Sequence, residues 1–404
     1  MNQFFIRNMR ALIFCFCIIF LFGCEKRINT NEIIGYDITD GIEKDEHIFL
    51  SSIAEEISYI PLETNSECLI TSIGGIVFTD HYILVSDDLN QLFLFNHEGK
   101  FLRQIGKKGH GPFEYVHTSD ALFSENGEEI FLFDGATLKL IKFNSSTGKG
   151  IKEVRINRFV PRNFKLLNDT ILAFYCSAAS FPFFRSYYHV FLMNTNLEII
   201  DSLFHRPELL TEDIGLRNWG LTGSYKRDDK LFFWDSDSDT IYSLDQERRL
   251  AGIFELKYDK YKMPASIIQK QDFEKNSGNY FFYDGITETD NYFFIDGIYQ
   301  GRYMKSILYN KISNQSSNVV FNYDIHDRGF HNDLDGGIPF WPRGVIGNNK
   351  VYDVVSPYKL KSLMSNDYFK TIPVKYEEKQ NELLSLIENS DPNDNPLIIF
   401  VKLK

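Results

Sequence analysis

The sequence predicts an all-β fold in which one small sheet is repeated around a ring. Aromatic residues fill 62 of the 404 positions, or 15%, and aromatic and β-branched residues suit the half-buried surfaces of sheets. From residue 57 onward, short apolar runs recur, and Asp, Asn or Gly ends each one, as in strands joined by tight turns. The clearest unit, residues 72–105, holds four such runs.

The second run of this unit carries a pattern that returns along the chain. It is a short, mainly apolar run closed by an aspartate, at residues 83–87, 130–134, 231–235 and 292–296, with weaker copies at 171–176 and 351–353. The copies begin 41 to 61 residues apart, and a period of roughly 40–50 residues is typical of propeller blades. We therefore predict a six-bladed β-propeller of four-stranded blades. A pair of β-sandwiches explains the short strands equally well, but not the repeated aspartate or the long period.

The two ends of the chain predict how the ring closes. Residues 397–403 form the last strand candidate, and residues 57–62 form a strand candidate that precedes the first blade. Pairing of these two strands would complete the last blade and remove an exposed sheet edge. Helical patterns at residues 358–364 and 377–389 interrupt the last blade, and we expect them to be short surface insertions.

The chain begins with an export signal. Arg7 and Arg10 precede a 12-residue apolar run, which is followed by Gly23 and Cys24. This order of features is typical of a signal peptide, and the apolar run is too short for an ordinary membrane-spanning helix. Residues 21–24, Leu-Phe-Gly-Cys, resemble a bacterial lipobox, so we predict that residues 1–23 are removed and that Cys24 is lipidated. An uncleaved anchor helix or a plain secretory signal is the alternative. Residues 24–54 would then be the lipidated N-terminus and tether, and residues 55–404 the propeller.

Charge and cysteine content narrow the class of partner. Loss of residues 1–23 removes two arginines and no acid, which moves the net charge from −12 to −14. An acidic chain is unsuited to nucleic acid and to electrostatic docking on anionic lipid, so the membrane would be held through the lipid alone. Cys68 and Cys176 both lie in apolar runs, and we expect two buried thiols. A disulfide between them is the alternative in an oxidising compartment.

Three segments then point to a known family. Residues 60–65 (Ile-Pro-Leu-Glu-Thr-Asn), residues 99–115 and residues 332–342 together resemble the six-bladed β-propeller lipoproteins of Gram-negative anaerobes, which are distantly similar to NHL-repeat propellers. The chain departs from that family at Phe113, where glycine is usual. The resemblance implies a lipoprotein of the outer membrane. Since Glu25 is followed by two basic residues and not by an acidic run, we favour the periplasmic face over the cell surface.

A glycine-rich loop is the first candidate for ligand binding. Residues 106–115 contain three glycines together with Lys107, Lys108 and His110. Such a loop can hold an anion through backbone N–H groups and lysine charge. A connection between blades that needs glycine for its turns is the alternative.

A polar segment near the C-terminus is the second candidate. Its ionisable residues are His326, Asp327, His331, Asp333 and Asp335. Asp333 and Asp335, at alternate positions before a glycine, form part of a calcium pattern, and two histidines five residues apart could also bind a transition metal. Trp341 and Arg343 add an aromatic surface and a positive charge, so that with Asp333 and Asp335 they could hold a sugar or a carboxylated ligand. A turn-rich polar loop is the alternative.

These features favour a lipid-anchored binding module of the cell envelope over an enzyme. Its partner would be an envelope protein, a glycan or a peptide, and the sequence requires no cofactor. No Gly-x-Ser-x-Gly or His-Glu-x-x-His motif is present. The alternative function is a metal-dependent, lactonase-like hydrolase or a lyase, with calcium or zinc at the central channel. Convergence of carboxylates from three or more blades at that channel would distinguish the two.

Overall fold

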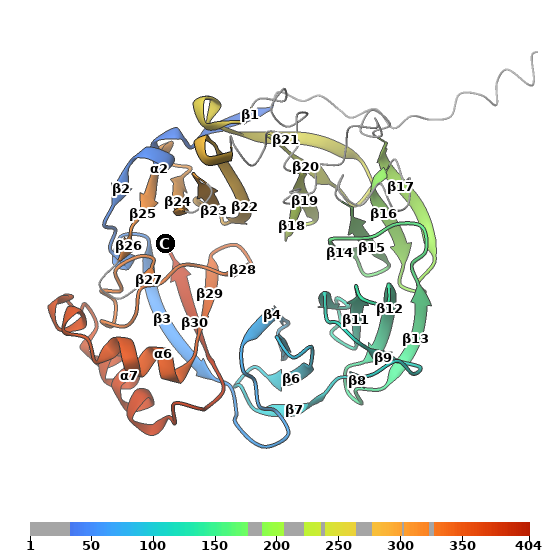
Figure 1. The fold of residues 1–404 in the computed structure, drawn as a ribbon, viewed down its shortest axis with the longest axis horizontal. Coiled ribbons are helices and arrows are strands. Elements are labelled where there is room, and N and C mark those ends of the chain that lie inside the picture. The colour runs from blue at the N-terminus through green and yellow to red at the C-terminus, as the bar shows by residue number, and fades with distance from the viewer. Residues whose placement is uncertain are drawn as a thin grey trace, which may run out of the picture.

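Six four-stranded blades stand around a central axis, each with its first strand nearest the axis (Figure 1). This computed structural model describes residues 33–176, 188–205, 222–235, 239–263, 277–300, 303–322 and 327–404. Strands within each blade are antiparallel. The predicted six-bladed β-propeller is confirmed.

The blades follow one another along the chain. Blades 1 to 3 are β4 (Ile73–Phe78), β5 (Tyr82–Asp87), β6 (Leu92–Asn96) and β7 (Phe101–Gln104); β10 (Asp120–Phe123), β11 (Glu129–Asp134), β12 (Lys139–Asn144) and β13 (Gly150–Arg155); and β14 (Asn163–Asn168), β15 (Ile171–Tyr175), β16 (Tyr188–Asn194) and β17 (Ile199–His205). Blades 4 to 6 are β18 (Thr222–Arg227), β19 (Lys230–Asp235), β20 (Thr240–Leu244) and β21 (Leu250–Lys257); β22 (Phe281–Glu288), β23 (Tyr292–Tyr299), β24 (Tyr303–Asn310) and β25 (Gln315–Val319); and β28 (Gly344–Ile346), β29 (Lys350–Val355), β30 (Leu397–Leu403) and β3 (Ala54–Pro61).

The repeated apolar run is the second strand of every blade. It is apolar at successive positions, and not at alternate ones, because each blade packs against a neighbour on both of its faces. In β5, Ile83 and Val85 pack in the cluster shared with blade 6, whereas Leu84 packs in the cluster shared with blade 2. Many of the aromatic residues pack between neighbouring blades in this way. Phe131 and Phe133, for example, are buried between blades 2 and 3.

Ring closure is achieved by the strand that precedes blade 1. β3 pairs antiparallel with β30, placing Ile57 opposite Val401 and Pro61 opposite Leu397. The outermost strand of blade 6 therefore comes from the N-terminal side of the domain, and the other three strands come from the C-terminal side. This confirms the predicted pairing of the two ends of the chain.

The N-terminal segment differs from the prediction. Residues 33–54, which we expected to belong to a tether, wrap around the outside of blades 4 and 5 (Figure 1). β1 (Ile34–Asp37) adds a parallel strand to β21, and β2 (Asp45–Glu46) adds one to β25. Between and after them lie α2 (Thr39–Glu43) and the 3₁₀ helix η1 (Leu50–Ser52). Its three main anchors are Ile38, Ile42 and Leu50, with 0%, 2% and 0% exposure. Ile38 and Ile42 pack in the cluster shared by blades 4 and 5, whereas Leu50 packs in the cluster shared by blades 5 and 6.

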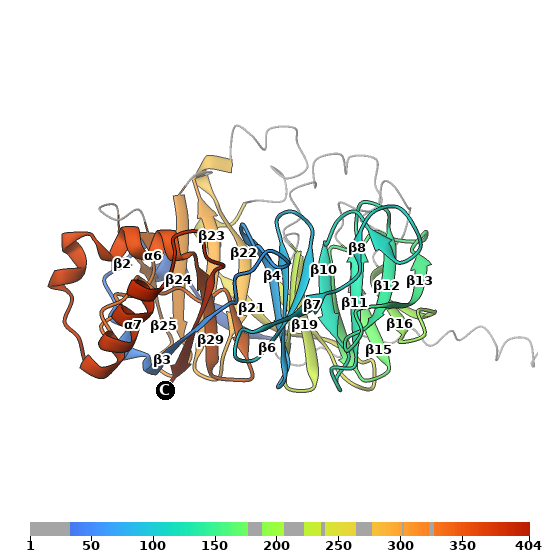
Figure 2. The ribbon, with the colours of Figure 1, turned by 90° about the horizontal axis from the view of Figure 1, so that it is seen from below.

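Helices lie beside blade 6, as the sequence predicts. α6 (Pro357–Met364), the 3₁₀ helix η7 (Asp367–Thr371) and α7 (Glu377–Asn389) connect β29 to β30 on the outer side of the ring (Figures 1 and 2). Ser356 caps α6 by accepting a hydrogen bond of 3.2 Å from the Lys359 N–H, and Pro357 takes the first helical position. Within the described residues, no helix is long and apolar enough to cross a membrane.

The ring has two distinct faces. In the parts of the chain that the structure describes, connections between blades, and connections between the second and third strands of a blade, lie on the face turned toward the viewer in Figure 1 and upward in Figure 2. We call this the crossover face. Short strands and turns occur in these connections, namely β8 (Lys107–Lys108), β9 (Glu114–Tyr115), β26 (Phe321–Asn322), β27 (Asp327–Arg328), η5 (Asp259–Tyr261) and η6 (Ser277–Asn279).

A buried charge cluster joins blades 4 and 5 at the opposite face. Glu288, only 7% exposed, ends β22 and accepts hydrogen bonds from Tyr225 (2.5 Å), Lys311 (2.6 Å) and Arg227. Arg227 also donates to the more exposed Asp290 at 2.8 Å. Each charged group of this cluster has a partner of opposite charge within the protein. The cluster therefore links the two blades structurally.

Candidate functional site

The junction of blades 5 and 6 on the crossover face gathers ionisable groups from distant parts of the chain. Asp296 and Asp353 are contributed by the second strands β23 and β29, at the aspartate position of the repeat. Asp327 and Arg328 come from the connection between the two blades. Arg343 immediately precedes the innermost strand of blade 6, and Lys359 lies in α6. We call these six residues the blade 5–6 cluster.

The same aspartate position has a different role in blades 1 and 2. Asp87 accepts hydrogen bonds from the backbone N–H (2.7 Å) and the side chain (3.1 Å) of Gln91, within its own turn. Asp134 accepts from Val116 N–H (2.9 Å) and the Thr137 hydroxyl (2.7 Å). Burial raises the pKa of Asp134, but these hydrogen bonds outweigh it and leave that pKa below its ordinary value. In both blades, hydrogen bonds within the protein therefore occupy the carboxylate.

Asp296 is held by two side chains from the connection between the blades. Its Oδ1 accepts hydrogen bonds from Arg328 Nη1 at 2.7 Å and from Trp341 Nε1 at 3.0 Å. Arg328 Nη1 also donates to the Ser306 hydroxyl at 3.0 Å. Burial raises the pKa of Asp296, attraction to Arg328 lowers it in part, and the neighbouring Asp284 raises it further. The result is a carboxyl group that binds its proton more tightly than usual.

Asp353 is the least satisfied carboxyl group of the cluster. It is half-buried, and its Oδ1 accepts one hydrogen bond of 2.7 Å from the N–H of Val354. Burial raises its pKa to about 6, although Arg343 and Lys359 attract the charged form. No residue in the described part of the chain donates a hydrogen bond to its second oxygen. Asp353 can therefore accept or donate a hydrogen bond near neutral pH.

Two cationic side chains lie near this carboxyl group, and they differ in whether they form an ion pair. Lys359 pairs with Asp327 across 3.0 Å. Arg343 is exposed, and its backbone N–H donates to the Tyr352 carbonyl at 2.7 Å. Its guanidinium forms no ion pair within 4 Å with any residue that the structure describes. A planar guanidinium in this state can bind a carboxylate through two parallel hydrogen bonds.

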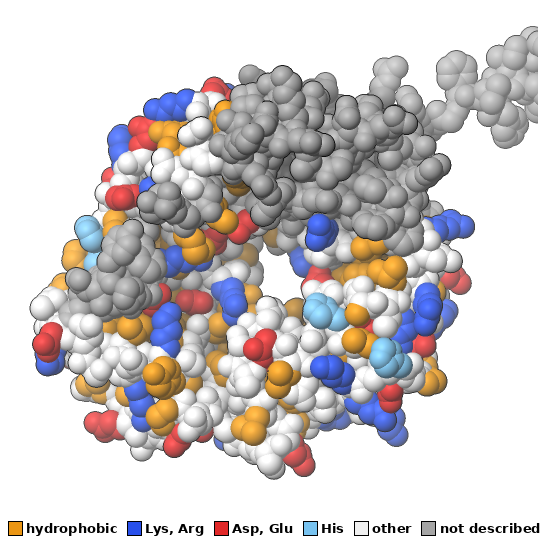
Figure 3. All heavy atoms as spheres, viewed as in Figure 1, with side chains coloured by type: hydrophobic (Ala, Val, Ile, Leu, Met, Phe, Trp, Pro, Cys, Tyr) orange, Lys and Arg blue, Asp and Glu red, His pale blue; other side chains and the backbone are white. Residues whose placement is uncertain are grey.

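The crossover face is hollowed at its centre, and charged and histidine side chains border the opening (Figure 3). Over the described ranges, no three His, Cys, Asp or Glu side chains gather closely enough to hold a metal ion. The convergence of carboxylates that would indicate a metal-dependent enzyme is thus not seen in that part of the chain.

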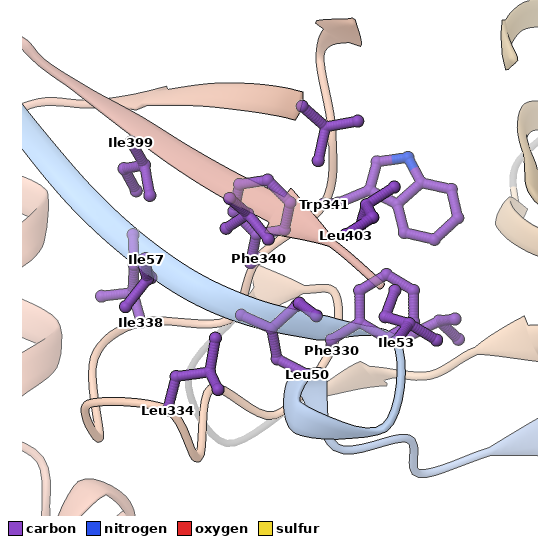
Figure 4. Packing of buried hydrophobic residues seen from close by; sticks show 14 of the residues in the cluster. Leu50, Ile53, Ile57, Phe330, Leu334, Ile338, Phe340, Trp341, Ile399 and Leu403 are labelled. Atoms are coloured by element: carbon purple, nitrogen blue, oxygen red, sulfur yellow. The ribbon is translucent and has the colours of Figure 1, made fainter. Parts of the chain in front are cut away.

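Trp341 does not form the ligand-stacking surface that we predicted. It is only 5% exposed and stacks on Phe330, with ring centroids 5.7 Å apart and planes at 22° (Figure 4). Its indole also packs edge-on against Phe294. The sequence could not show this burial, because both aromatic partners are separated from Trp341 in the chain and meet it only in the core between blades 5 and 6.

Asp333 and Asp335, predicted to bind a ligand or a metal, instead hold the N-terminal segment. Asp333 accepts hydrogen bonds from the N–H (2.8 Å) and the hydroxyl (2.6 Å) of Ser51. Asp335 is fully buried and accepts from the Tyr59 hydroxyl and the Gly337 N–H, both at 2.9 Å. Both carboxylates are therefore part of ring closure, and they do not lie in the blade 5–6 cluster.

The histidine candidates are also separated from these carboxylates. His331 Nε2 lies 2.9 Å from His47 Nδ1, so one of the two rings donates a hydrogen bond to the other. Burial, followed by the neighbouring His47, lowers the pKa of His331. His326 lies outside the described residues. The segment thus binds the N-terminal wrap, and its described members do not form a shared metal site.

The glycine-rich loop does hold anions, but they are carboxylates of the protein itself. Gly111 N–H donates to Glu114 at 2.8 Å, and Phe113 N–H donates to Glu153 at 2.7 Å. Lys107 pairs with Glu114 at 3.0 Å, whereas Lys108 donates to the Leu89 carbonyl at 3.2 Å and His110 is exposed. Phe113 has a φ of 56°, the left-handed conformation that glycine usually supplies. The loop is therefore a connection whose hydrogen-bonding groups are largely occupied.

Both cysteines among the described residues, Cys68 and Cys176, are free and buried. Burial is the main cause that raises the pKa of each thiol. This confirms the expected pair of buried thiols and shows that Cys68 and Cys176 form no disulfide.

Of the blade 5–6 cluster, only Arg343 was proposed from the sequence as a ligand-binding residue, and Asp327 was noted as a neighbour. Asp296 and Asp353 are the aspartates that close two copies of the repeat. This position in the repeat was the sequence feature from which they could have been identified. Arg328 and Lys359 belong to no motif, so they are identified only by their contacts with Asp296 and Asp327.

A model of a family described as a domain of unknown function, DUF4934, matches residues 33–402. The chain belongs to this family. The matched range begins at Ile33, so the DUF4934 domain includes the segment that wraps around blades 4 and 5 as well as the ring itself.

Three solved structures match the chain to different degrees, and the first of them shares this fold. A Bacteroides fragilis protein described as exported has a TM-score of 0.69 at 19% identity, covering 92% of this chain and 99% of that chain. A DUF4221 family member from Bacteroides vulgatus has a TM-score of 0.47 at 11% identity, covering 87% and 97%. Virginiamycin B lyase from Staphylococcus aureus has a TM-score of 0.39 at 12% identity, covering 74% and 94%. No curated protein matches the chain.

Proposed function

We propose that this protein is a lipoprotein of the outer membrane, exposed on the periplasmic side, and that it acts as a binding module without catalytic activity. The export signal and Cys24 support this location. The Bacteroides fragilis relative with the same fold is described as an exported protein, which agrees with it. The partner would be an envelope protein, or a glycan or peptide that carries a carboxylate.

The exposed guanidinium of Arg343 beside the raised-pKa carboxyl group of Asp353 is the observation that carries this function. The equivalent aspartates of blades 1 and 2 accept hydrogen bonds from nearby turns and from the connection between these blades, whereas Asp353 and Arg343 retain unused hydrogen-bonding capacity toward solvent. Exposed polar groups on loops held by a rigid scaffold are typical of recognition sites.

The chemistry of the pair selects a ligand class. Arg343 would bind a carboxylate in a bidentate manner, and the adjacent Asp353 would exchange a hydrogen bond with a hydroxyl or amide of the same ligand. Lys359 and Arg328 already pair with Asp327 and Asp296, respectively. Their positive charges would therefore attract the ligand electrostatically more than they would contact it. An acidic sugar or a peptide with a free carboxylate satisfies both requirements.

Calorimetric titration of the mature chain with Cys24→Ser tests this assignment. The probes are trigalacturonic acid and the dipeptide Ala-Glu, each compared with its methyl ester, in which the carboxylates are uncharged and the rest of the molecule is unchanged. We expect at least one free acid to bind about 10-fold more tightly than its ester, since a charge-assisted pair contributes on the order of 1.5–3 kcal/mol.

Arginine variants supply the matched comparison. Arg343→Ala should abolish the preference for the acid over the ester. Arg249→Ala should retain it, because Arg249 is also exposed but pairs with Asp245 in blade 4. Equal binding of acid and ester by the unmodified protein, or no binding of either, would show that Arg343 is not a carboxylate receptor.

The alternative function, a metal-dependent hydrolase or lyase, receives no specific support from the described residues, which contain no group of three metal-ligating side chains. Elemental analysis of the purified protein tests it independently. A stoichiometric content of calcium or zinc that survives dialysis would favour the enzyme over the binding module.

A further inference from the structure

We propose that the outer edge of blade 4, where β1 lies, faces the lipid bilayer, so that the propeller is held edge-on to the membrane. This inference rests on the lipidation of Cys24 in the proposed function. It goes beyond that function because it states which surface of the ring meets lipid.

The length of chain between the lipid and the ring is the first argument. The segment that wraps around the ring begins at Ile33, and nine peptide bonds join Ile33 to Cys24. An extended chain spans at most about 3.3–3.6 Å per residue, so this link reaches at most about 30 Å. Had residues 24–54 formed the tether, the reach would have been about 100 Å, because it would have contained three times as many residues.

The size of the ring turns this length into an orientation. A domain of this length has a radius of gyration of about 21 Å, which corresponds to a diameter of about 50 Å. Blade 1 lies across the ring from blade 4 (Figure 1). A link of about 30 Å attached at blade 4 cannot pass around the ring, so the outer edge of blade 1 cannot rest on the membrane.

The surface at the attachment point is the second argument. β1 pairs with β21 on one side only, and it forms the outermost strand of blade 4. Ile33 and Ile34, at its beginning, are 40% and 54% exposed. Apolar side chains on an open sheet edge are a liability in water and are stabilised in the interfacial region of a bilayer. They lie at the very position where the link to the lipid ends.

Edge-on attachment has a consequence for the blade 5–6 cluster. With blade 4 at the bilayer, the crossover face stands roughly perpendicular to the membrane, and the entrance to the cluster remains open to a soluble ligand. A ring lying flat on its crossover face would instead cover Arg343 and Asp353 with lipid.

Energy transfer to the membrane distinguishes these orientations. The lipidated protein is reconstituted in phosphatidylethanolamine vesicles that carry a rhodamine lipid, and a donor dye is attached to one cysteine introduced by Lys257→Cys (β21, blade 4) or Leu102→Cys (β7, blade 1). Both positions are exposed, and both native thiols within the ring are buried. We expect transfer from position 257 to be at least about twofold more efficient than from position 102, because the ring diameter of about 50 Å separates them.

Lengthening of the link supplies the control. Insertion of 20 Gly/Ser residues between Arg27 and Ile28 adds a coil of about 25 Å root-mean-square length, which should reduce the difference between the two positions. Equal transfer from positions 257 and 102 without the insertion, or stronger transfer from position 102, would overturn the edge-on orientation.

A fatty-acid label read on the same samples separates the two proposals. Absence of the label from the unmodified protein, or its persistence in Cys24→Ala, would refute the lipid anchor itself and the orientation with it. Presence of the label together with equal transfer would leave the anchor intact and refute only the orientation.

Discussion

The hydroxyl of Tyr59 donates a hydrogen bond of 2.9 Å to Oδ2 of Asp335, a carboxyl group with 0% exposure. Tyr59 belongs to β3, the strand that closes the ring, and Asp335 belongs to the connection between blades 5 and 6. Burial raises the pKa of Asp335 to about 6, and hydrogen bonds from Gly337 and Tyr59 oppose that rise. This pair thus couples the protonation of one buried carboxyl group to ring closure.

Tyr59→Phe should therefore destabilise the protein more at pH 8 than at pH 4.5. At pH 8 the variant leaves a buried carboxylate without one of its donors, which costs roughly 1–3 kcal/mol. At pH 4.5 Asp335 is protonated and the loss is smaller. Urea unfolding at both pH values measures the difference. Tyr82→Phe is the control, since the Tyr82 hydroxyl has no hydrogen bond to a described residue, and a Tyr59→Phe effect equal at both pH values would refute the coupling.

Asp353→Asn should change the pH dependence of stability in a defined direction. Because the folded-state pKa of Asp353 is raised to about 6, its stabilising contribution is complete below pH 4 and is lost as the pH rises through 6. The Asn variant does not undergo this loss, so its stability relative to the unmodified protein should improve by about 1–3 kcal/mol between pH 4 and pH 7.5.

Asp245→Asn is the opposite control for this measurement. Burial raises the pKa of Asp245, but hydrogen bonds from Arg249 outweigh it and leave the pKa below its ordinary value. Its contribution is present above the unfolded pKa and lost at lower pH, so this variant should lose relative stability as the pH rises. Slopes of the same sign for the two variants would contradict the assignment.

Glu288→Gln should be much more destabilising than Asp290→Asn, although both residues pair with Arg227. Glu288 has an 8% exposed side chain and meets two cations, so its neutralisation leaves Arg227 and Lys311 without a buried counter-charge. We expect a loss of about 3–5 kcal/mol for Glu288→Gln. Asp290 is 51% exposed and should cost at most about 1 kcal/mol. Comparable losses in urea unfolding would show that the cluster is not effectively buried.

Gly99→Ala should cost more stability than Gly347→Ala, although both glycines have positive φ. Gly347 has a φ of 61° with no atom within 4 Å of the added Cβ, so only the backbone penalty of roughly 1–2 kcal/mol applies. At Gly99, with a φ of 81°, the Cβ would approach the Pro61 carbonyl oxygen to 2.2 Å. Pro61 ends the closing strand β3, so thermal unfolding should show an additional loss, and equal melting temperatures would refute this steric coupling.

The closing aspartates of the repeat show both the reach and the limit of prediction from sequence. Their spacing correctly located the second strand of every blade, because strand and turn patterns depend on neighbours in the chain. Asp87 and Asp296 look alike in sequence, yet Asp87 binds its own turn while Asp296 binds Arg328 and Trp341. The partner of each carboxylate depends on contacts between blades, which no local pattern records.

The same distinction explains the predictions that were wrong. Residues 33–54 were predicted to belong to a tether because they show no clear strand or helix period. Ile38, Ile42 and Leu50 become anchors only through packing against residues of blades 4, 5 and 6, which are distant in the chain. Trp341 read as an exposed aromatic because nothing near it in the chain reveals Phe294 and Phe330.

By itself, the sequence determined the number of blades, the strand that closes the ring and the helices beside blade 6, since periodicity and turn chemistry act over a few residues. Only the tertiary structure decided which carboxylates are hydrogen-bonded within the fold and which keep an oxygen available to a ligand. It also shortened the link between Cys24 and the ring to nine peptide bonds. Both outcomes depend on burial, and burial is a property of residues that are distant in the chain and adjacent in the folded ring.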